Sequence, residues 1–168
     1  MKKFMTGFIA GVFTLLAAGF LFFFFGGMPV ATRGKALPME EFLAHLALDK
    51  AIGSEADRPA PFEANEQVYL SGAKTYSKNC AICHGSFEGK PSTIALGLFP
   101  HPPTLLPPEK GVTDDPVGET YWKIKNGIRL TGMPGFEQSL TENEMWEMSL
   151  LLHDADHLPT TVQSLLRH

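Results

Sequence analysis

The chain has 168 residues, of which 44% are hydrophobic, and its 14 basic and 18 acidic side chains leave a net charge of −4. This length accommodates one folded domain with appendages. The acidic balance excludes the basic footprint that is typical of nucleic-acid-binding proteins, so we predict no nucleic-acid partner; it would suit a partner with a basic surface.

The first 27 residues have the composition of a membrane segment. Lys2 and Lys3 precede an apolar run, Phe4 to Phe25, of about 22 residues. As a helix this run would span roughly 33 Å, which is enough for the hydrocarbon core of a bilayer. The run is longer than the apolar stretch of a cleaved signal peptide, and Gly26 to Ala31 make a poor cleavage site. We predict an uncleaved anchor over residues 1–27, with a signal sequence as the alternative.

Residues 28–61 are predicted to hold a juxtamembrane helix and a linker. Helix signals begin at Pro38 and end before Gly53, which places Leu43 and Leu46 on one face of a helix over 38–52. That face could lie against the following domain, the membrane surface or a partner, and the sequence leaves the three open. The prolines and charges that follow Gly53 indicate an extended linker as far as Ala64.

Three longer helices are predicted in the folded part of the chain. The first runs from Glu66 to Cys80 behind a cap at Asn65. The second covers Pro116 to Asn126 and ends at a glycine. The third runs from Glu142 to about His153, behind a capping box formed by Thr141 and Glu144.

The segments around these helices carry their own expectations. Ser86 to Thr113 is rich in glycine and proline, and loops this long are usually functional or disordered. Residues 159–168 are expected to fray. Gly72, inside the first helix, is either a tolerated glycine that costs about 1 kcal/mol against alanine or a point where another helix approaches closely.

The only two cysteines lie three positions apart and are followed by a histidine, in the sequence Cys80-Ala-Ile-Cys83-His84. This is the pattern of c-type haem attachment. Each thiol can form a thioether with one vinyl group of a haem, and the histidine then supplies an axial ligand to the iron. We predict one covalent haem c, held through Cys80 and Cys83 with His84 as a ligand.

Other readings of the cysteine pair are weaker. A thioredoxin-like redox pair is expected within a βαβ pattern, which the flanking sequence does not contain. A structural disulfide between Cys80 and Cys83 would close too small a loop to constrain the chain much. A structural zinc site needs four ligands, usually with a second Cys or His pair. His153 and His157 have a suitable spacing, but they fall in the last predicted helix and its exit.

The second axial ligand has several candidates. Met133 lies in a turn-rich loop between Gly132 and Pro134, outside any predicted helix, where a thioether could approach iron closely. We therefore predict Met133 as the ligand, with His101 as a weaker contender. The remaining candidates lie in or next to the last helix, where methionine usually packs in a core: Met145, Met148, His153 and His157.

The order of these motifs resembles class I cytochrome c over about residues 62–159. The residues that carry the resemblance are Gly72, Tyr76, the CAICH motif with Gly85, Pro103–Leu105, Tyr121–Trp122, Thr131–Pro134 and Trp146. The resemblance implies an all-α fold with three to four helices around one covalent haem, here preceded by a transmembrane helix and a short helix. The corresponding organisation is an anchor (1–27), a juxtamembrane segment (28–61), a cytochrome c domain (62–158) and a tail (159–168).

The resemblance also implies roles for single residues. His84 and Met133 would be the axial pair, and the Pro103 carbonyl, or that of its neighbour Pro102, would accept the Nδ1–H of His84. Leu105 would pack on the haem face. Trp122 would line the pocket or reach a propionate, and the helix with Gly72 and Tyr76 would cross the last helix near Trp146.

These features predict a one-electron carrier rather than an enzyme, because two axial ligands leave no position for a substrate. The layout resembles membrane-anchored bacterial monohaem cytochromes. Haem c is attached outside the cytoplasm, so the domain should lie on the periplasmic side of the bacterial inner membrane and exchange electrons with a donor and an acceptor protein. One alternative is a haem c subunit of a larger membrane dehydrogenase or oxidase, in a respiratory complex. A second is an enzyme or gas sensor in which the Met133 bond opens.

Overall fold

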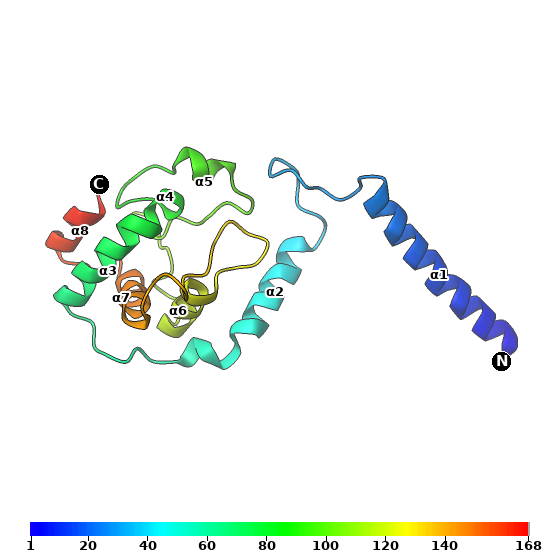
Figure 1. The fold of residues 1–168 in the computed structure, drawn as a ribbon, viewed down its shortest axis with the longest axis horizontal. Coiled ribbons are helices and arrows are strands. Elements are labelled where there is room, and N and C mark those ends of the chain that lie inside the picture. The colour runs from blue at the N-terminus through cyan, green and yellow to red at the C-terminus, as the bar shows by residue number, and fades with distance from the viewer. Residues whose placement is uncertain (168) are drawn as a thin grey trace. The chain divides into compact units, whose positions relative to one another are not determined.

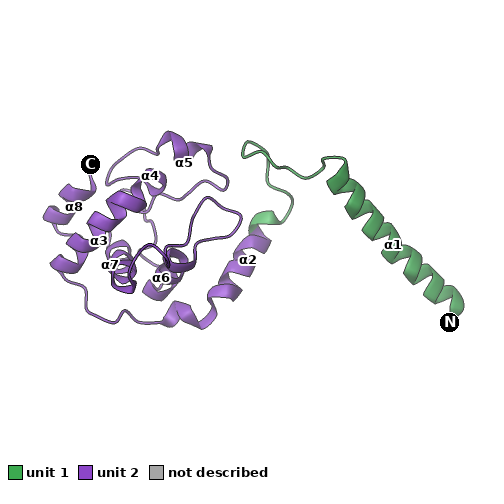
Figure 2. Cartoon of the chain, viewed as in Figure 1, with its two compact units in different colours: residues 1–41 green, residues 42–168 purple. Residues whose placement is uncertain are grey.

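A computed structural model describes residues 1–167, which form helices and no strand (Figure 1). The α-helices are α1 (Lys2–Phe24), α2 (Glu40–Ile52), α3 (Glu66–Asn79), α4 (Ala81–His84), α5 (Thr93–Gly97), α6 (Val117–Asn126), α7 (Glu142–His153) and α8 (Thr160–Leu166). A 3₁₀-helix, η1 (Gly53–Asp57), follows α2. The chain divides into two compact units, Met1–Glu41 and a second that begins at Phe42 (Figure 2). The predicted all-α class is confirmed.

Helix α1 is long and apolar enough to cross a membrane. Its 23 residues correspond to about 35 Å of helix, and none of its side chains is buried. Length and composition are therefore compatible with the predicted anchor.

Helix α2 leaves most of its apolar side chains in solvent. Ile52 is its only buried residue, whereas Phe42, Leu43 and Leu46 are exposed. No part of residues 42–167 buries these side chains, so the three surfaces considered from the sequence stay open.

The predicted extended linker, Gly53 to Ala64, begins instead with a short helix. Residues 53–57 form η1, which packs against α6. The contact depends on Gly118 of α6: a Cβ there would lie 2.4 Å from the Glu55 carbonyl oxygen and 2.6 Å from that of Arg58. The prediction missed this helix because its stability comes from a tertiary contact and the segment has few helix signals of its own.

Arg58, directly after η1, contacts side chains of both α6 and α7. Its guanidinium donates to the Glu142 carboxylate at 2.8 Å and lies over the rings of Tyr121, at 5.2 Å, and Trp146, at 5.4 Å. The two rings stack on each other with centroids 3.9 Å apart. A cation over aromatic faces contributes about 0.5–1 kcal/mol at a partly exposed site.

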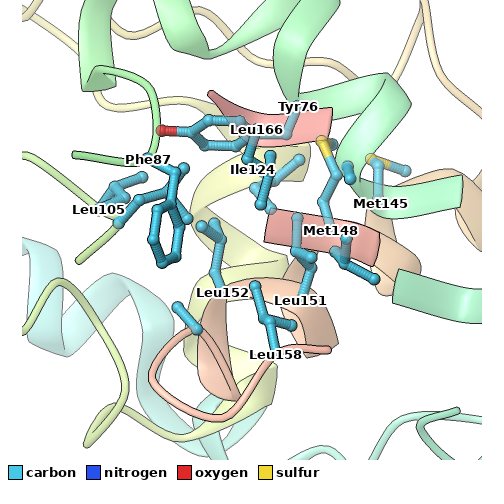
Figure 3. Close-up of a cluster of buried hydrophobic side chains, with 14 of the residues drawn as sticks. Tyr76, Phe87, Leu105, Ile124, Met145, Met148, Leu151, Leu152, Leu158 and Leu166 are labelled. Carbon is cyan, nitrogen blue, oxygen red and sulfur yellow. The ribbon is translucent and has the colours of Figure 1, made fainter. Parts of the chain in front are cut away.

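Helices α3 and α7 cross at Gly72. A Cβ on Gly72 would lie 2.5 Å from the Glu147 carbonyl oxygen and 3.3 Å from the Leu151 Cβ, so the backbones meet without a side chain between them. This confirms the close approach predicted for Gly72. Tyr76, one turn on, is fully buried in the core (Figure 3). Its hydroxyl donates to the Gly85 carbonyl at 2.7 Å.

The expectation of a frayed C-terminal tail is wrong. Residues 160–166 form α8, which packs against α3, and Val162 and Leu166 belong to the same buried cluster as Tyr76 (Figure 3). The Leu166 carbonyl also accepts a hydrogen bond from the Phe87 amide at 2.7 Å. The segment therefore completes the core of the domain.

The contribution of α8 can be measured with two neighbouring leucines. Leu166→Ala should lower the free energy of unfolding by about 2–4 kcal/mol, because it leaves a cavity in the core. Leu165 of the same helix is 40% exposed, so Leu165→Ala should change stability by only about 0.5 kcal/mol. Denaturant unfolding of both variants checks this difference, and equal losses would contradict it.

Candidate haem site

The Cys-x-x-Cys-His motif forms a short helical turn. Asn65 caps α3 by accepting from the Val68 amide at 3.1 Å, and α3 ends at Asn79, directly before Cys80. Cys83 and His84 lie in α4, which Gly85 ends with φ +83°, a conformation that favours glycine. One short turn therefore positions both thiols and the imidazole.

The backbone holds the imidazole of His84 in place through its Nδ1 atom. Its Nδ1 lies 2.8 Å from the carbonyl oxygen of Pro103, and the Leu105 amide donates to the His84 carbonyl at 3.3 Å. Burial lowers the pKa of His84, against the opposing effect of the Pro103 hydrogen bond. A neutral imidazole whose Nδ1–H donates to a carbonyl leaves Nε2 as the free electron-pair donor.

The two cysteines are not equivalent, and they do not form a disulfide. Cys80 Sγ lies 3.8 Å from the Met148 Sδ of α7, and burial raises the pKa of this thiol to about 12, with a smaller effect from Cys83. Both side chains are partly buried and both line the same cleft.

Met133 is held in a loop closed by its own hydrogen bonds. Its amide donates to the Thr131 hydroxyl at 3.1 Å, and its carbonyl accepts from the Ile128 amide at 3.2 Å. Gly127 begins the loop with φ +68°, and a Cβ there would lie 2.4 Å from the Gly135 nitrogen. Only glycine allows the two ends of the loop to meet so closely.

The Cys-x-x-Cys-His motif and the Met133 loop line the same apolar cleft. Its walls include Cys80, Cys83 and His84 from the motif, Pro103 and Leu105 from the following segment, and Met133 from the loop. Its empty volume is about 810 Å³, which includes space open to solvent.

The other candidates for the second axial ligand lie outside this cleft, with the exception of His101. His101 lines it, with its Nδ1 3.4 Å from the Ala95 carbonyl oxygen. Met145 and Met148 are buried in the core (Figure 3). His153 contacts the Asp115 carbonyl oxygen, and His157 contacts the neighbouring carboxylate of Asp156.

Trp122 is not among the residues that line the cleft; it lies half-buried on α6. Ile124 lines the cleft from that helix, and Ile128 and Phe136 line it from the segment that follows. Sequence reasoning missed these three. The stripe of Tyr121 and Ile124 on α6 was the signal that could have identified Ile124, whereas Ile128 and Phe136 lie in a segment without periodicity.

These donors fit a haem. A neutral imidazole with a free Nε2 and a thioether both line the cleft, and they are ligands that haem iron takes in cytochromes c. The two thiols are not joined in a disulfide, and they border the same space. The remaining walls are mostly apolar, as a porphyrin face requires.

An all-helical domain with such a cleft is the domain of a class I c-type cytochrome. Residues 67–150, half of the chain, match the family model described as cytochrome C oxidase, cbb3-type, subunit III, and the chain belongs to this family. Membership assigns it to haem-based electron transfer. No curated protein matches the chain.

Proposed function

We propose that the protein carries one electron at a time on a single haem c, bound covalently through Cys80 and Cys83. His84 and Met133 would be the axial ligands. The observation that carries the proposal is the cleft: it places both thiols, an oriented imidazole and a thioether from a distant loop around one apolar space.

The haem would supply a one-electron ferric–ferrous couple, and the protein's part is to hold it and set its potential. Pro103 orients His84 through Nδ1. The Thr131 and Ile128 hydrogen bonds keep the Met133 loop closed. Leu105, together with Ile124 and other apolar walls, excludes water, and a thioether ligand raises the potential.

Helix α1 and the attachment chemistry support a proposal for the location. A helix of this length and composition supports a single-pass anchor in a bacterial inner membrane. Haem c is attached outside the cytoplasm, so we place the domain on the periplasmic side. Redox proteins that give and take the electron are its partners there.

A second candidate function is that of a haem c subunit in a larger membrane complex. The matched family is described as a subunit of a cytochrome oxidase, and this supports a stoichiometric respiratory partner. Extraction in mild detergent distinguishes the two: co-purification of such a partner favours the subunit, and a lone monomer favours the carrier.

Intact mass and a visible spectrum of the full chain, made in a host that attaches haem, test the proposal. We expect the added mass of one haem and a low-spin spectrum with a thioether–iron charge-transfer band. Cys80→Ala with Cys83→Ala should remove the covalent mass completely, because both thioether bonds are lost. Retention of that mass in the double variant, or a bis-histidine spectrum in the wild type, would contradict the assignment.

A further inference from the structure

Helix α2 has an apolar face that residues 42–167 leave exposed. Phe42, Leu43 and Leu46 are 61%, 53% and 44% exposed. At 3.6 residues per turn they lie within an arc of about 100°, the width of the apolar stripe of an amphipathic helix. We call these three side chains the α2 stripe. They occupy the first half of the helix, whereas Ile52, its only buried residue, lies at the C-terminal end, next to η1.

The charged and titratable side chains of α2 do not interrupt the stripe. Glu40, Glu41 and His45 fall outside its arc, and Asp49 and Lys50 follow it along the helix, where the apolar face ends. A helix that lies in the plane of a membrane interface has this organisation, with phenylalanine and leucine towards the lipid and charged residues on the other side.

The stripe is too small to hold a second copy of the chain or another folded protein. A specific protein–protein interface buries roughly 800 Å² per partner and takes about 20–30 residues a side. The charges of Asp49 and Lys50 prevent the stripe from continuing along the helix. A lipid interface sets no such minimum, because binding to it scales with whatever apolar area is buried.

The segment that joins α1 to α2 also has the composition of a membrane-surface segment. Residues 25–39 contain two charged side chains, Arg33 and Lys35, and both are positive, which suits the phosphate groups of a bilayer. Their exposed large apolar side chains are Phe25, Met28, Val30 and Met39. The half of α2 that carries the stripe follows this segment directly, and the half with Ile52 leads into the folded domain.

We propose that the α2 stripe binds the surface of the membrane that α1 spans, with its three side chains below the lipid headgroups. The inference rests on the part of the proposed function that places α1 in a membrane, and it does not depend on the haem. It makes α2 a second contact between the chain and the lipid. Because α2 continues into η1, which packs on α6, this contact would also restrict how the cytochrome domain turns above the bilayer.

The test uses the full haem-loaded chain in lipid nanodiscs made of equal parts of phosphatidylcholine and phosphatidylglycerol. A nitroxide is attached to one added cysteine, at Leu46→Cys in the stripe, at Glu41→Cys outside its arc, or at Val12→Cys in α1. Electron paramagnetic resonance measures how often each label collides with oxygen, which concentrates in lipid, and with a nickel chelate, which stays in water. We expect the ratio of oxygen to nickel collisions to be at least about fivefold higher at Leu46→Cys than at Glu41→Cys, because interfacial helices bury only one face.

A double substitution supplies the matched comparison, with the label kept at Leu46→Cys. Phe42→Ser with Leu43→Ser should lower the ratio at this label to that of the Glu41→Cys label, because the apolar area that holds the helix in the interface is lost. Ile94→Ser with Leu165→Ser removes two exposed apolar side chains outside α2, and it should leave the ratio within about twofold, since single exposed apolar residues elsewhere carry no membrane contact. Equal effects of the two double variants would overturn the proposal.

The remaining outcomes separate this inference from the proposed function. Equal ratios at Leu46→Cys and Glu41→Cys, with the Val12→Cys label in lipid, would overturn the inference alone. Dipolar broadening between Leu46→Cys labels that disappears on dilution with unlabelled chains would assign the stripe to a second copy and also overturn it. A Val12→Cys label in water would refute the anchor and the inference together. Absence of covalent haem by mass would refute the proposed haem attachment, and the Leu46→Cys label, with Cys80→Ala and Cys83→Ala added, would still report on the stripe.

Discussion

Met133→Leu should convert a closed haem site into one that binds carbon monoxide. Leucine matches methionine in volume, so the fold should lose less than about 1.5 kcal/mol, but it offers no donor to iron. We expect loss of the thioether–iron charge-transfer band in the ferric protein and binding of carbon monoxide to the ferrous protein at neutral pH, which the wild type should resist.

Met39 provides a control for this substitution, because it is exposed and does not line the cleft. Met39→Leu should keep the charge-transfer band and the resistance to carbon monoxide. If Met133→Leu also keeps both, the sixth ligand lies elsewhere in the cleft, with His101 as the next candidate.

Gly72→Val should destabilise the domain strongly, because Gly72 lies where α3 crosses α7. Its side chain would enter the space now occupied by the Glu147 carbonyl of α7, where even a Cβ would be 2.5 Å from the oxygen. Overpacking of this kind costs about 3 kcal/mol. The strain would also separate α3 from α7, where Cys80 contacts Met148.

Lys74→Val is the matched substitution on the exposed side of the same helix. It introduces the same β-branched side chain and should cost less than about 1 kcal/mol. Thermal unfolding of the two haem-loaded variants compares them directly. A similar loss in both would show that helix propensity, rather than the crossing at Gly72, sets the effect.

The helices that carry the site could be predicted because their end signals are local. Asn65 and the capping box at Thr141 each bond to amides three residues on, and the observed α3 and α7 begin where these signals place them. The motif and the Met133 loop were also recognisable, since each is a contiguous pattern of residues.

The features that the prediction missed depend on contacts between distant residues. Helix η1 is stabilised by its close packing on the backbone of Gly118 in α6. Helix α8 is stabilised because Val162 and Leu166 are buried in the same core as residues of α3. Neither partner is visible from the short segment itself. Tyr121, next to Trp122 in the sequence, is the ring that stacks on Trp146, and Trp122 remains half-buried outside the cleft lining.

In the proposed arrangement, with α1 in the membrane and a haem in the cleft, the attachment of η1 through Arg58 would limit the distance between the haem and the membrane. The segment after α2 is held against α6 and α7. The flexible connection is therefore the stretch of 15 residues between Phe24, the end of α1, and Glu40, the start of α2. Fully extended, such a stretch spans about 50 Å, and α2 could add about 20 Å. A tether of this length would confine the search for a partner to a layer above the bilayer, and short tethers give effective concentrations of millimolar order. Modest affinity for a redox partner would then suffice, which would allow the rapid release that repeated turnover needs.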